Sequence, residues 1–301
     1  QPVAHCLLRG ASQPGAVVEL PQIENVEMHK TVALQAADVM LAVPAENCMT
    51  LIDTLITVPC LSDNYAYLVR SGDRVAVVDV PDAAPILAAL TRNGLSLTDI
   101  LLTHHHWDHI DGVPDLVAAT GAQVWGAASD AHRLPPLDHA LSPGDTMTLG
   151  DAQARIIDVS GHTIGHIAYL FDGLAFTGDS LMAGGCGRLF EGTPDQMHAS
   201  LSQFAALPGD TLIASGHEYT DTNLRFALSL EPDNPAIISR KAEVERLRAA
   251  NRPSVPSTLD TERNTNPFLR AHEASLKAAT GTTGQSDENT FAAARCAKDA
   301  F

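Results

Sequence analysis

Residues 103–109 read Thr103-His104-His105-His106-Trp107-Asp108-His109, which places four imidazoles and one carboxylate within seven residues, directly after an apolar run at 100–102. Imidazole nitrogen and carboxylate oxygen are ligands that suit zinc, iron and manganese. Alternate residues of an extended segment point the same way, so we expect His104, His106 and Asp108 to share one side, with His109 following as the chain turns. One structural zinc ion rarely needs so many ligands from a single loop. The motif therefore indicates two adjacent metals.

A solvated histidine run or a tag is the alternative interpretation of this stretch. A tag is terminal and repetitive, whereas this run is internal, follows an apolar segment and is interrupted by Trp107 and Asp108. We therefore interpret the run as a metal-binding motif.

Three further candidate ligands each follow a glycine directly: His162 after Gly161, Asp179 after Gly178, and His217 after Gly216. Glycine lets the backbone turn sharply and approach a bound group closely. One such pair carries little information by itself. Together with the histidine motif, however, the three resemble a known pattern.

The motif T-x-H-x-H-x-D-H resembles the signature of the metallo-β-lactamase superfamily, and the three later candidates follow it in the order of that superfamily. From Leu51 to Phe301 the chain resembles one branch of it, the hydroxyacylglutathione hydrolases or glyoxalase II enzymes. The resemblance does not extend to the first 48 residues. It implies the α/β class: a metallo-β-lactamase-like αβ/βα sandwich followed by a mostly helical C-terminal domain.

The resemblance also implies two divalent ions per chain, zinc with iron or manganese as alternatives. The implied ligands are His104, His106 and His162 for one ion, Asp108, His109 and His217 for the other, and Asp179 as a bridge between both. Asp108 and Asp179 would be the catalytic carboxylates. Asp79, which lies near the end of the apolar run 75–80, would support the metal loop from behind. His105 and His166 match no ligand, and we interpret them as packing or supporting residues.

The glutathione contacts implied by the same resemblance are Arg188, Tyr219, Arg295 and Lys298. The N-P-F-L-R motif at 266–270 and the R-x-x-K-D-x-F motif at 295–301 resemble the tail of that family. Arg188 replaces a lysine of some members, and Phe190 stands where some members carry tyrosine, so one hydroxyl contact is missing. Without the family pattern, Arg295 and Lys298 would be interpreted as a solvated helix face.

Strand and helix signals alternate in the first half of the chain, and several short strands follow from residue 146 onward, which predicts a mixed sheet and a more antiparallel one. We expect strands at 51–58, 65–69, 75–80, 100–102, 123–125, 146–149, 154–159, 167–171 and 174–177. We expect helices at 85–93, 113–119, 128–134, 224–230, 235–250, 271–279 and 288–298, the first of them ending at Gly94.

The expected organisation is an unassigned N-terminal extension at 1–48, a catalytic domain at 49–218 and a helical, glutathione-binding domain at 219–301. Residues 1–48 resemble neither a signal peptide nor a transit peptide, because no cationic region precedes their apolar run and they contain several acids. We expect the functional protein to begin near Met49, with the preceding residues as a disordered extension or a misassigned gene start.

Composition limits the partners. The net charge of −17 argues against nucleic acid or an anionic membrane, both of which need a basic surface. No apolar run is long enough to span a bilayer. The five cysteines are scattered and form no C-x-x-C pair, which fits a reducing cytosol. We therefore expect a cytoplasmic protein that binds neither nucleic acid nor membrane. We also expect a monomer, and the family resemblance implies a small glutathione thioester as its partner.

The sequence lacks a G-x-S-x-G elbow and shows no cysteine beside a base, so a covalent route is unsupported and the metals are expected to activate water. A thiolate with a pKa of about 8.5 departs without a strong general acid, which favours a thioester over an amide. The family resemblance then implies hydrolysis of S-(2-hydroxyacyl)glutathione, typically S-D-lactoylglutathione, to glutathione and D-lactate, the second step of methylglyoxal detoxification.

Other functions on the same fold are the alternatives. One is a mononuclear iron persulfide dioxygenase that acts on glutathione, another is a different hydrolase, and a third is a non-catalytic metal-binding or electron-transfer module. A β-lactamase would not usually carry Asp108 and His109 together, and a tRNA-processing nuclease would need a basic surface. Metal content separates these alternatives: two metals with esterase activity favour the hydrolase, and one iron with oxygen uptake favours the dioxygenase.

Overall fold

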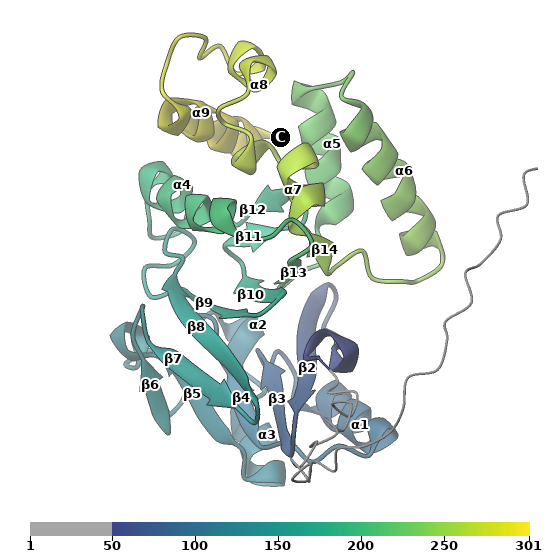
Figure 1. The fold of residues 1–301 in the computed structure, drawn as a ribbon, viewed down its shortest axis with the longest axis vertical. Coiled ribbons are helices and arrows are strands. Elements are labelled where there is room, and N and C mark those ends of the chain that lie inside the picture. The colour runs from purple at the N-terminus through teal and green to yellow at the C-terminus, as the bar shows by residue number, and fades with distance from the viewer. Residues whose placement is uncertain (1–49) are drawn as a thin grey trace, which may run out of the picture. The chain divides into compact units, whose positions relative to one another are not determined.

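Two six-stranded sheets pack face to face in the computed structural model, which describes residues 50–301 (Figure 1). The predictions for residues 1–48 and for the start at Met49 lie outside the described residues. The described residues fall within one compact unit, and the predicted boundary between residues 218 and 219 stays a prediction. Among the described residues, no helix has the length and apolar character needed to cross a membrane.

The first sheet has the strand order β1-β2-β3-β4-β5-β6. Its strands are β1 Ile56–Cys60, β2 Asn64–Ser71, β3 Arg74–Val78, β4 Asp99–Leu101, β5 Gln123–Ala127 and β6 His139–Leu141. The first three pair antiparallel, and β3 to β6 run parallel. Parallel neighbours need crossovers, which α1 Ala83–Asn93, α2 Trp107–Ile110 and α3 Val113–Thr120 supply. Gly94 ends α1 in the left-handed conformation, as predicted.

The second sheet has the order β14-β13-β10-β9-β8-β7 and is mainly antiparallel, as predicted. Its strands are β7 Thr146–Leu149, β8 Ala152–Asp158, β9 Ile167–Phe171, β10 Leu174–Gly178, β13 Leu212–Ser215 and β14 Ser257–Thr258. A two-stranded hairpin of β11 Leu181–Met182 and β12 Gly185–Cys186 follows β10. Helix α4 Pro194–Ser202 and the 3₁₀ turn Gln203–Ala206 come before β13.

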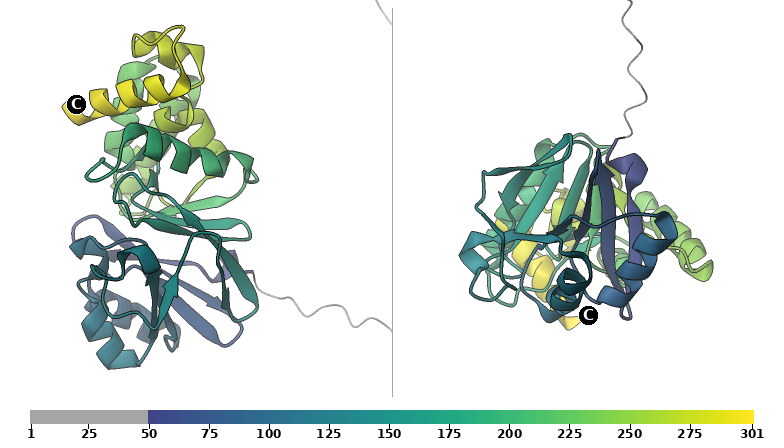
Figure 2. Two further views of the ribbon diagram at one scale, coloured as in Figure 1. Left: turned by 90° about the vertical axis from the view of Figure 1, so that its left-hand side faces the viewer. Right: turned by 90° about the horizontal axis from the view of Figure 1, so that it is seen from below.

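The remaining helices gather beyond one end of the two sheets (Figure 2). They are α5 Thr220–Leu230, α6 Pro235–Ala249, α7 Leu259–Thr265, α8 Ala274–Ala279 and α9 Asp287–Ala300, with a 3₁₀ turn at Pro267–Leu269. Side-chain caps begin several of them: the Ser286 hydroxyl accepts a hydrogen bond from the backbone N–H of Asn289 at the start of α9.

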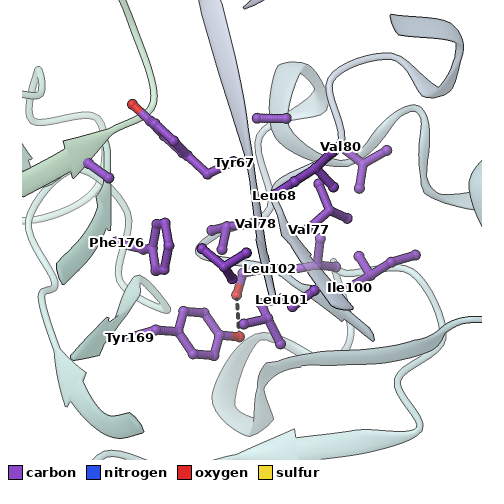
Figure 3. Close-up of a cluster of buried hydrophobic side chains, with 14 of the residues drawn as sticks. Tyr67, Leu68, Val77, Val78, Val80, Ile100, Leu101, Leu102, Tyr169 and Phe176 are labelled. Carbon is purple, nitrogen blue, oxygen red and sulfur yellow. Dashed lines mark hydrogen bonds between the residues drawn. The ribbon is translucent and has the colours of Figure 1, made fainter. Parts of the chain in front are cut away.

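The core between the sheets also contains hydrogen bonds that join them (Figure 3). Tyr169 of β9 donates through its hydroxyl to the carbonyl oxygen of Leu102 at 3.0 Å. Tyr67 of β2 donates to the carbonyl oxygen of Ser215 at 2.6 Å. Leu102 precedes the histidine motif and Ser215 precedes Gly216-His217, so these buried bonds place the two strand ends relative to each other.

Several predicted elements were wrong in extent. The first strand begins at Ile56, because the Asp53 carboxylate accepts the N–H of Thr50 and holds a 3₁₀ turn at Ile52–Thr54. The helix predicted at 128–134 is only a 3₁₀ turn, Ala128–Asp130, and the predicted helix at 271–279 begins at Ala274. In α6, Ile237 and Val244 are buried, whereas Ile238 is exposed.

Candidate metal centre

Seven side chains converge where strands of both sheets end. His104 and His106 follow β4, His162 follows β8, Asp179 follows β10, and His217 follows β13. The expectation that Asp108 lies on an extended segment with His104 and His106 was wrong. His106 occupies the position before α2, so Asp108 and His109 project from a helical turn. This turn still brings Asp108 and His109 to the same place, beside His217.

The first cluster consists of His104, His106 and His162. Nδ1 of His106 lies 3.1 Å from Nε2 of His104 and 2.9 Å from Nε2 of His162. Burial lowers the pKa of all three imidazoles, that of His106 to about 4. The rings are therefore neutral at pH 7, which is the form that binds a metal.

The second cluster consists of Asp108, His109 and His217. Nε2 of His217 lies 3.3 Å from Nε2 of His109 and 3.4 Å from Oδ2 of Asp108. Unlike the first cluster, it combines ring nitrogens with a carboxylate oxygen, and these atoms lie within 4.8 Å of one another.

Asp179 lies between the two clusters. Its Oδ2 is 3.2 Å from Nε2 of His217 and 3.5 Å from Nε2 of His162, and its Oδ1 is 3.5 Å from Nε2 of His109. Oδ1 is buried and has no hydrogen-bond partner within residues 50–301. A buried carboxylate oxygen without a donor, facing converging ring nitrogens, fits a divalent cation. The donor set of nitrogen and oxygen therefore suits two metals with Asp179 shared.

The opposite nitrogen of three of the rings is held by a partner outside the clusters. Nδ1 of His109 lies 2.8 Å from Oδ2 of Asp79, Nδ1 of His217 lies 2.9 Å from Oδ1 of Asp63, and Nδ1 of His162 lies 2.7 Å from the carbonyl oxygen of Arg188. Each acceptor selects the tautomer with the proton on Nδ1 and leaves the lone pair of Nε2 toward the cluster.

A cavity of about 660 Å³ opens beside the clusters, and all four residues predicted to contact substrate line it: Arg188, Tyr219, Arg295 and Lys298. The side chain of Arg188 is exposed, and Tyr219 stacks on His217 with ring centroids 4.6 Å apart. Arg295 lines the cavity but is itself almost wholly buried. Only 5% of it is exposed, and its Nη1 donates to the carbonyl oxygen of Cys186 at 3.1 Å.

Comparisons with known proteins fit this geometry. Residues 61–238 match the family model of the metallo-beta-lactamase superfamily, and residues 218–301 match that of the hydroxyacylglutathione hydrolase C-terminus. A hydroxyacylglutathione hydrolase of Jannaschia sp. (strain CCS1) is 59% identical over 251 residues, covering 82% of this chain and 98% of the relative. One of Fuscovulum blasticum is 60% identical with the same coverage. The chain belongs to the hydroxyacylglutathione hydrolase family.

Solved structures show the same fold for this family member. A B3 metallo-beta-lactamase, BLEG-1, has a TM-score of 0.56 at 23% identity and covers 72% of this chain and 99% of its own. The protein TTHA1623, solved in a di-iron-bound form, has a TM-score of 0.53 at 26% identity and covers 71% of this chain and 99% of its own. The sandwich and helical tail predicted from the sequence are thus confirmed.

The structure adds supporting residues that the sequence of this hydrolase family member did not reveal. Asp63 holds His217, and the amide of Asn64 donates to the backbone oxygen and to Oδ2 of Asp108 at 2.9 and 3.1 Å. Asp63 lies in the turn before β2 and Asn64 is the first residue of β2, and acidic and amide residues are common at turns for conformational reasons alone. The two unmatched histidines pack as expected: His166 stacks on His104, and His105 contacts Asp130.

Proposed function

We propose that this chain is a dinuclear metal-dependent thioester hydrolase that cleaves S-(2-hydroxyacyl)glutathione, with S-D-lactoylglutathione as substrate, to glutathione and D-lactate. The observation that carries the proposal is the single cavity whose wall contains Asp108, His162, Asp179 and His217 together with the cations of the tail. The relatives that bear the name hydroxyacylglutathione hydrolase are 52–60% identical over nearly their whole length. They do not favour the persulfide dioxygenase alternative.

Two divalent ions are proposed for the clusters, zinc with iron or manganese as alternatives. His104, His106 and His162 would hold one ion, Asp108, His109 and His217 the other, and Asp179 would contact both. When bound, such a pair lowers the pKa of water and polarises a carbonyl group. The known di-iron form of TTHA1623, a protein of the same fold, supports a paired site.

The residues of the site then orient the reactants. Asp108 and Asp179 are the carboxylates on the cavity wall, and each can accept a hydrogen bond from the attacking water. The Cys186 thiol lines the same wall, but burial raises its pKa to about 11, so it stays protonated and does not compete as a nucleophile.

Glutathione thioesters are anionic, whereas this protein carries a net charge of −17, so binding requires local cations. Arg188 and Lys298 supply them at the cavity, and the Tyr219 hydroxyl provides a hydrogen-bonding group beside His217. The departing thiolate needs no strong general acid, because its pKa is about 8.5. We also propose a cytosolic monomer, consistent with the free thiols of Cys60, Cys186 and Cys296 among the described residues.

The test is hydrolysis of S-D-lactoylglutathione by the purified full chain, followed as loss of thioester absorbance, with metal analysis of the same sample. Turnover with about two metals per chain is the expected result. Two metals without turnover of this or any other glutathione thioester would overturn the substrate. One iron with consumption of oxygen would overturn the reaction class.

A further inference from the structure

The hairpin β11–β12 is held by side chains from the helices that follow the sandwich, beside α7 in Figure 1. The hairpin turns at Ala183-Gly184, whose backbone groups cannot be satisfied by two such short strands. Side chains replace the missing partners. The carboxylate of Glu262 accepts the N–H of Gly184 at 2.7 Å, and the amide of Asn223 donates to the carbonyl oxygen of Ala183 at 3.0 Å.

Asn266 completes this set of contacts. Its Nδ2 donates to the carbonyl oxygens of Met182 and Gly185 at 3.0 and 2.9 Å, and to Oε2 of Glu262 at 3.0 Å. Both strands of the hairpin are therefore tied to one amide, which is itself tied to the Glu262 carboxylate. Glu262 is 1% exposed and Asn266 is fully buried, so water cannot replace either group.

Burying the carboxyl group of Glu262 at this position costs free energy. Its donors, namely Gly184, Ser257 and Asn266, are all neutral, and burial raises the pKa of its carboxyl group above the usual range. A buried acid without a cationic partner contributes less to stability than apolar side chains of similar volume would. Its presence is better explained by the geometry that it imposes on the hairpin.

That geometry reaches the metal centre directly. Strand β12 continues into Gly187 and Arg188, and the carbonyl oxygen of Arg188 accepts the Nδ1–H of His162 at 2.7 Å. A Cβ atom on Gly187 would lie 2.0 Å from the carbonyl oxygen of Asp179 and 2.8 Å from Nδ1 of His162. The segment after the hairpin is thus pressed against two of the proposed ligands, and a shift of the hairpin moves the acceptor that orients His162.

We propose that Glu262 and Asn266 are positioning residues that lock the hairpin 181–186 so that the Arg188 carbonyl holds the His162 ring toward the metal centre. The helical region then has a second role besides binding substrate: it sets the geometry of a ligand that belongs to the sandwich. The proposal rests on the dinuclear centre proposed above.

The test compares two near-isosteric variants of the metal-loaded full chain. Asn266→Asp keeps the shape of the side chain but replaces its NH2 donor with an oxygen acceptor. This oxygen would face two carbonyl oxygens and the Glu262 carboxylate, all of them acceptors, so the hairpin must shift. Glu262→Gln removes the charge but keeps an acceptor for Gly184 and Asn266 and can donate to Ser257. The readout is the rate of metal loss to a chelator at 25 °C, together with kcat and KM.

We expect Asn266→Asp to lose metal about tenfold faster and to have a lower kcat, because outer partners of a ligand change metal affinity by about this factor. Glu262→Gln, which keeps the acceptor for Gly184 and Asn266, should increase the rate of metal loss less than Asn266→Asp does. Glu231→Gln is the matched control: Glu231 is a buried carboxylate that pairs with Arg270 at 2.7 Å in the same helical region, away from the hairpin. It should lower the melting temperature without changing metal loss.

The proposal would be overturned if Asn266→Asp lost metal at the wild-type rate and kept the wild-type kcat while its melting temperature fell as in the control. Asn266 would then have a merely structural role. If that variant does not fold, Glu262→Asp, whose shorter side chain withdraws the acceptor from Gly184, answers the same question with a smaller change. A wild-type chain that binds no pair of metals would instead refute the proposed function, which the metal analysis reveals before any variant is made.

Discussion

Nδ1 of His105 lies 2.8 Å from Oδ2 of Asp130, a carboxylate with no exposed surface. The other oxygen of Asp130 accepts from Nε of Arg133, and Arg133 in turn pairs with Glu191. Glu191 also accepts the backbone N–H of Ile164 at 2.8 Å. One ion-pair network therefore connects the histidine motif, the turn after His162 and the segment beside Phe190.

We predict that Asp130→Ala lowers the free energy of unfolding by about 3 kcal/mol, because it leaves Arg133 and His105 without their buried partner. Activity should fall as well, since His105 lies between two proposed ligands. Denaturant unfolding and steady-state kinetics measure both effects. Asp172→Ala, an exposed change in the turn between β9 and β10, is the control and should stay within about 0.5 kcal/mol of the wild type. Equal stability of the two variants would contradict the network's importance.

Asp179→Asn should reduce the metal content of the purified chain from about two ions to about one. Oδ2 of Asp179 lies near both His162 of the first cluster and His217 of the second, and a neutral amide oxygen binds a divalent cation less strongly than a carboxylate oxygen does. Metal analysis after dialysis measures the stoichiometry. Asp63→Asn is the control: it weakens the support of His217, so affinity should fall about tenfold while two ions still bind at saturation. Two tightly bound ions and full activity in Asp179→Asn would exclude the bridging role.

Substrate binding should weaken as the pH rises above about 8. Burial, followed by the nearby charge of Arg295, lowers the pKa of Lys298 to about 8, and the other groups that act on it are Cys186, Arg225 and Asp299. Lys298 carries its charge below this pKa and loses it above, so the KM for an anionic thioester rises through this range. We compare the ratio of variant to wild-type KM from pH 6.5 to 9.5.

Lys298→Met should have a KM about tenfold higher than the wild type at pH 7, and the difference should disappear at high pH, because both proteins then lack the charge. Lys298→Arg keeps a charge throughout and should bind better than the wild type at pH 9.5. A ratio independent of pH for both variants would mean that Lys298 does not contact the anion.

Phe190→Tyr should lower the KM for S-D-lactoylglutathione about fivefold, the effect of one added hydrogen bond of about 1 kcal/mol. Phe190 is 61% exposed at the cavity, with its ring edge-on to His106 and His162, so a hydroxyl group fits without repacking. Phe190→Leu removes the ring and adds no polar group, so its KM should not fall. An unchanged KM in Phe190→Tyr would show that the hydroxyl points away from glutathione.

The sequence by itself determined the fold class and the set of converging side chains that we propose as ligands. The histidine motif and the glycine-preceded residues His162, Asp179 and His217 are local patterns, and glycine is needed wherever the backbone passes close to the site. At Gly216, for example, a Cβ atom would lie 2.5 Å from Oδ1 of Asp179. Such requirements leave a signature in the chain, because they depend on a residue and its immediate neighbours.

Only the tertiary structure decided which residues support these ligands. Asp63 meets His217 from 154 positions away, and Glu262 meets Gly184 across 78 positions. Arg295, predicted as a substrate contact, is also buried against Cys186, because α9 packs there. Hydrogen-bonding partners of this kind are ordinary polar residues in turns and helices, and their role follows from packing between distant segments. That packing minimises the exposed apolar surface and the number of unsatisfied polar groups over the whole chain, so no local pattern records it.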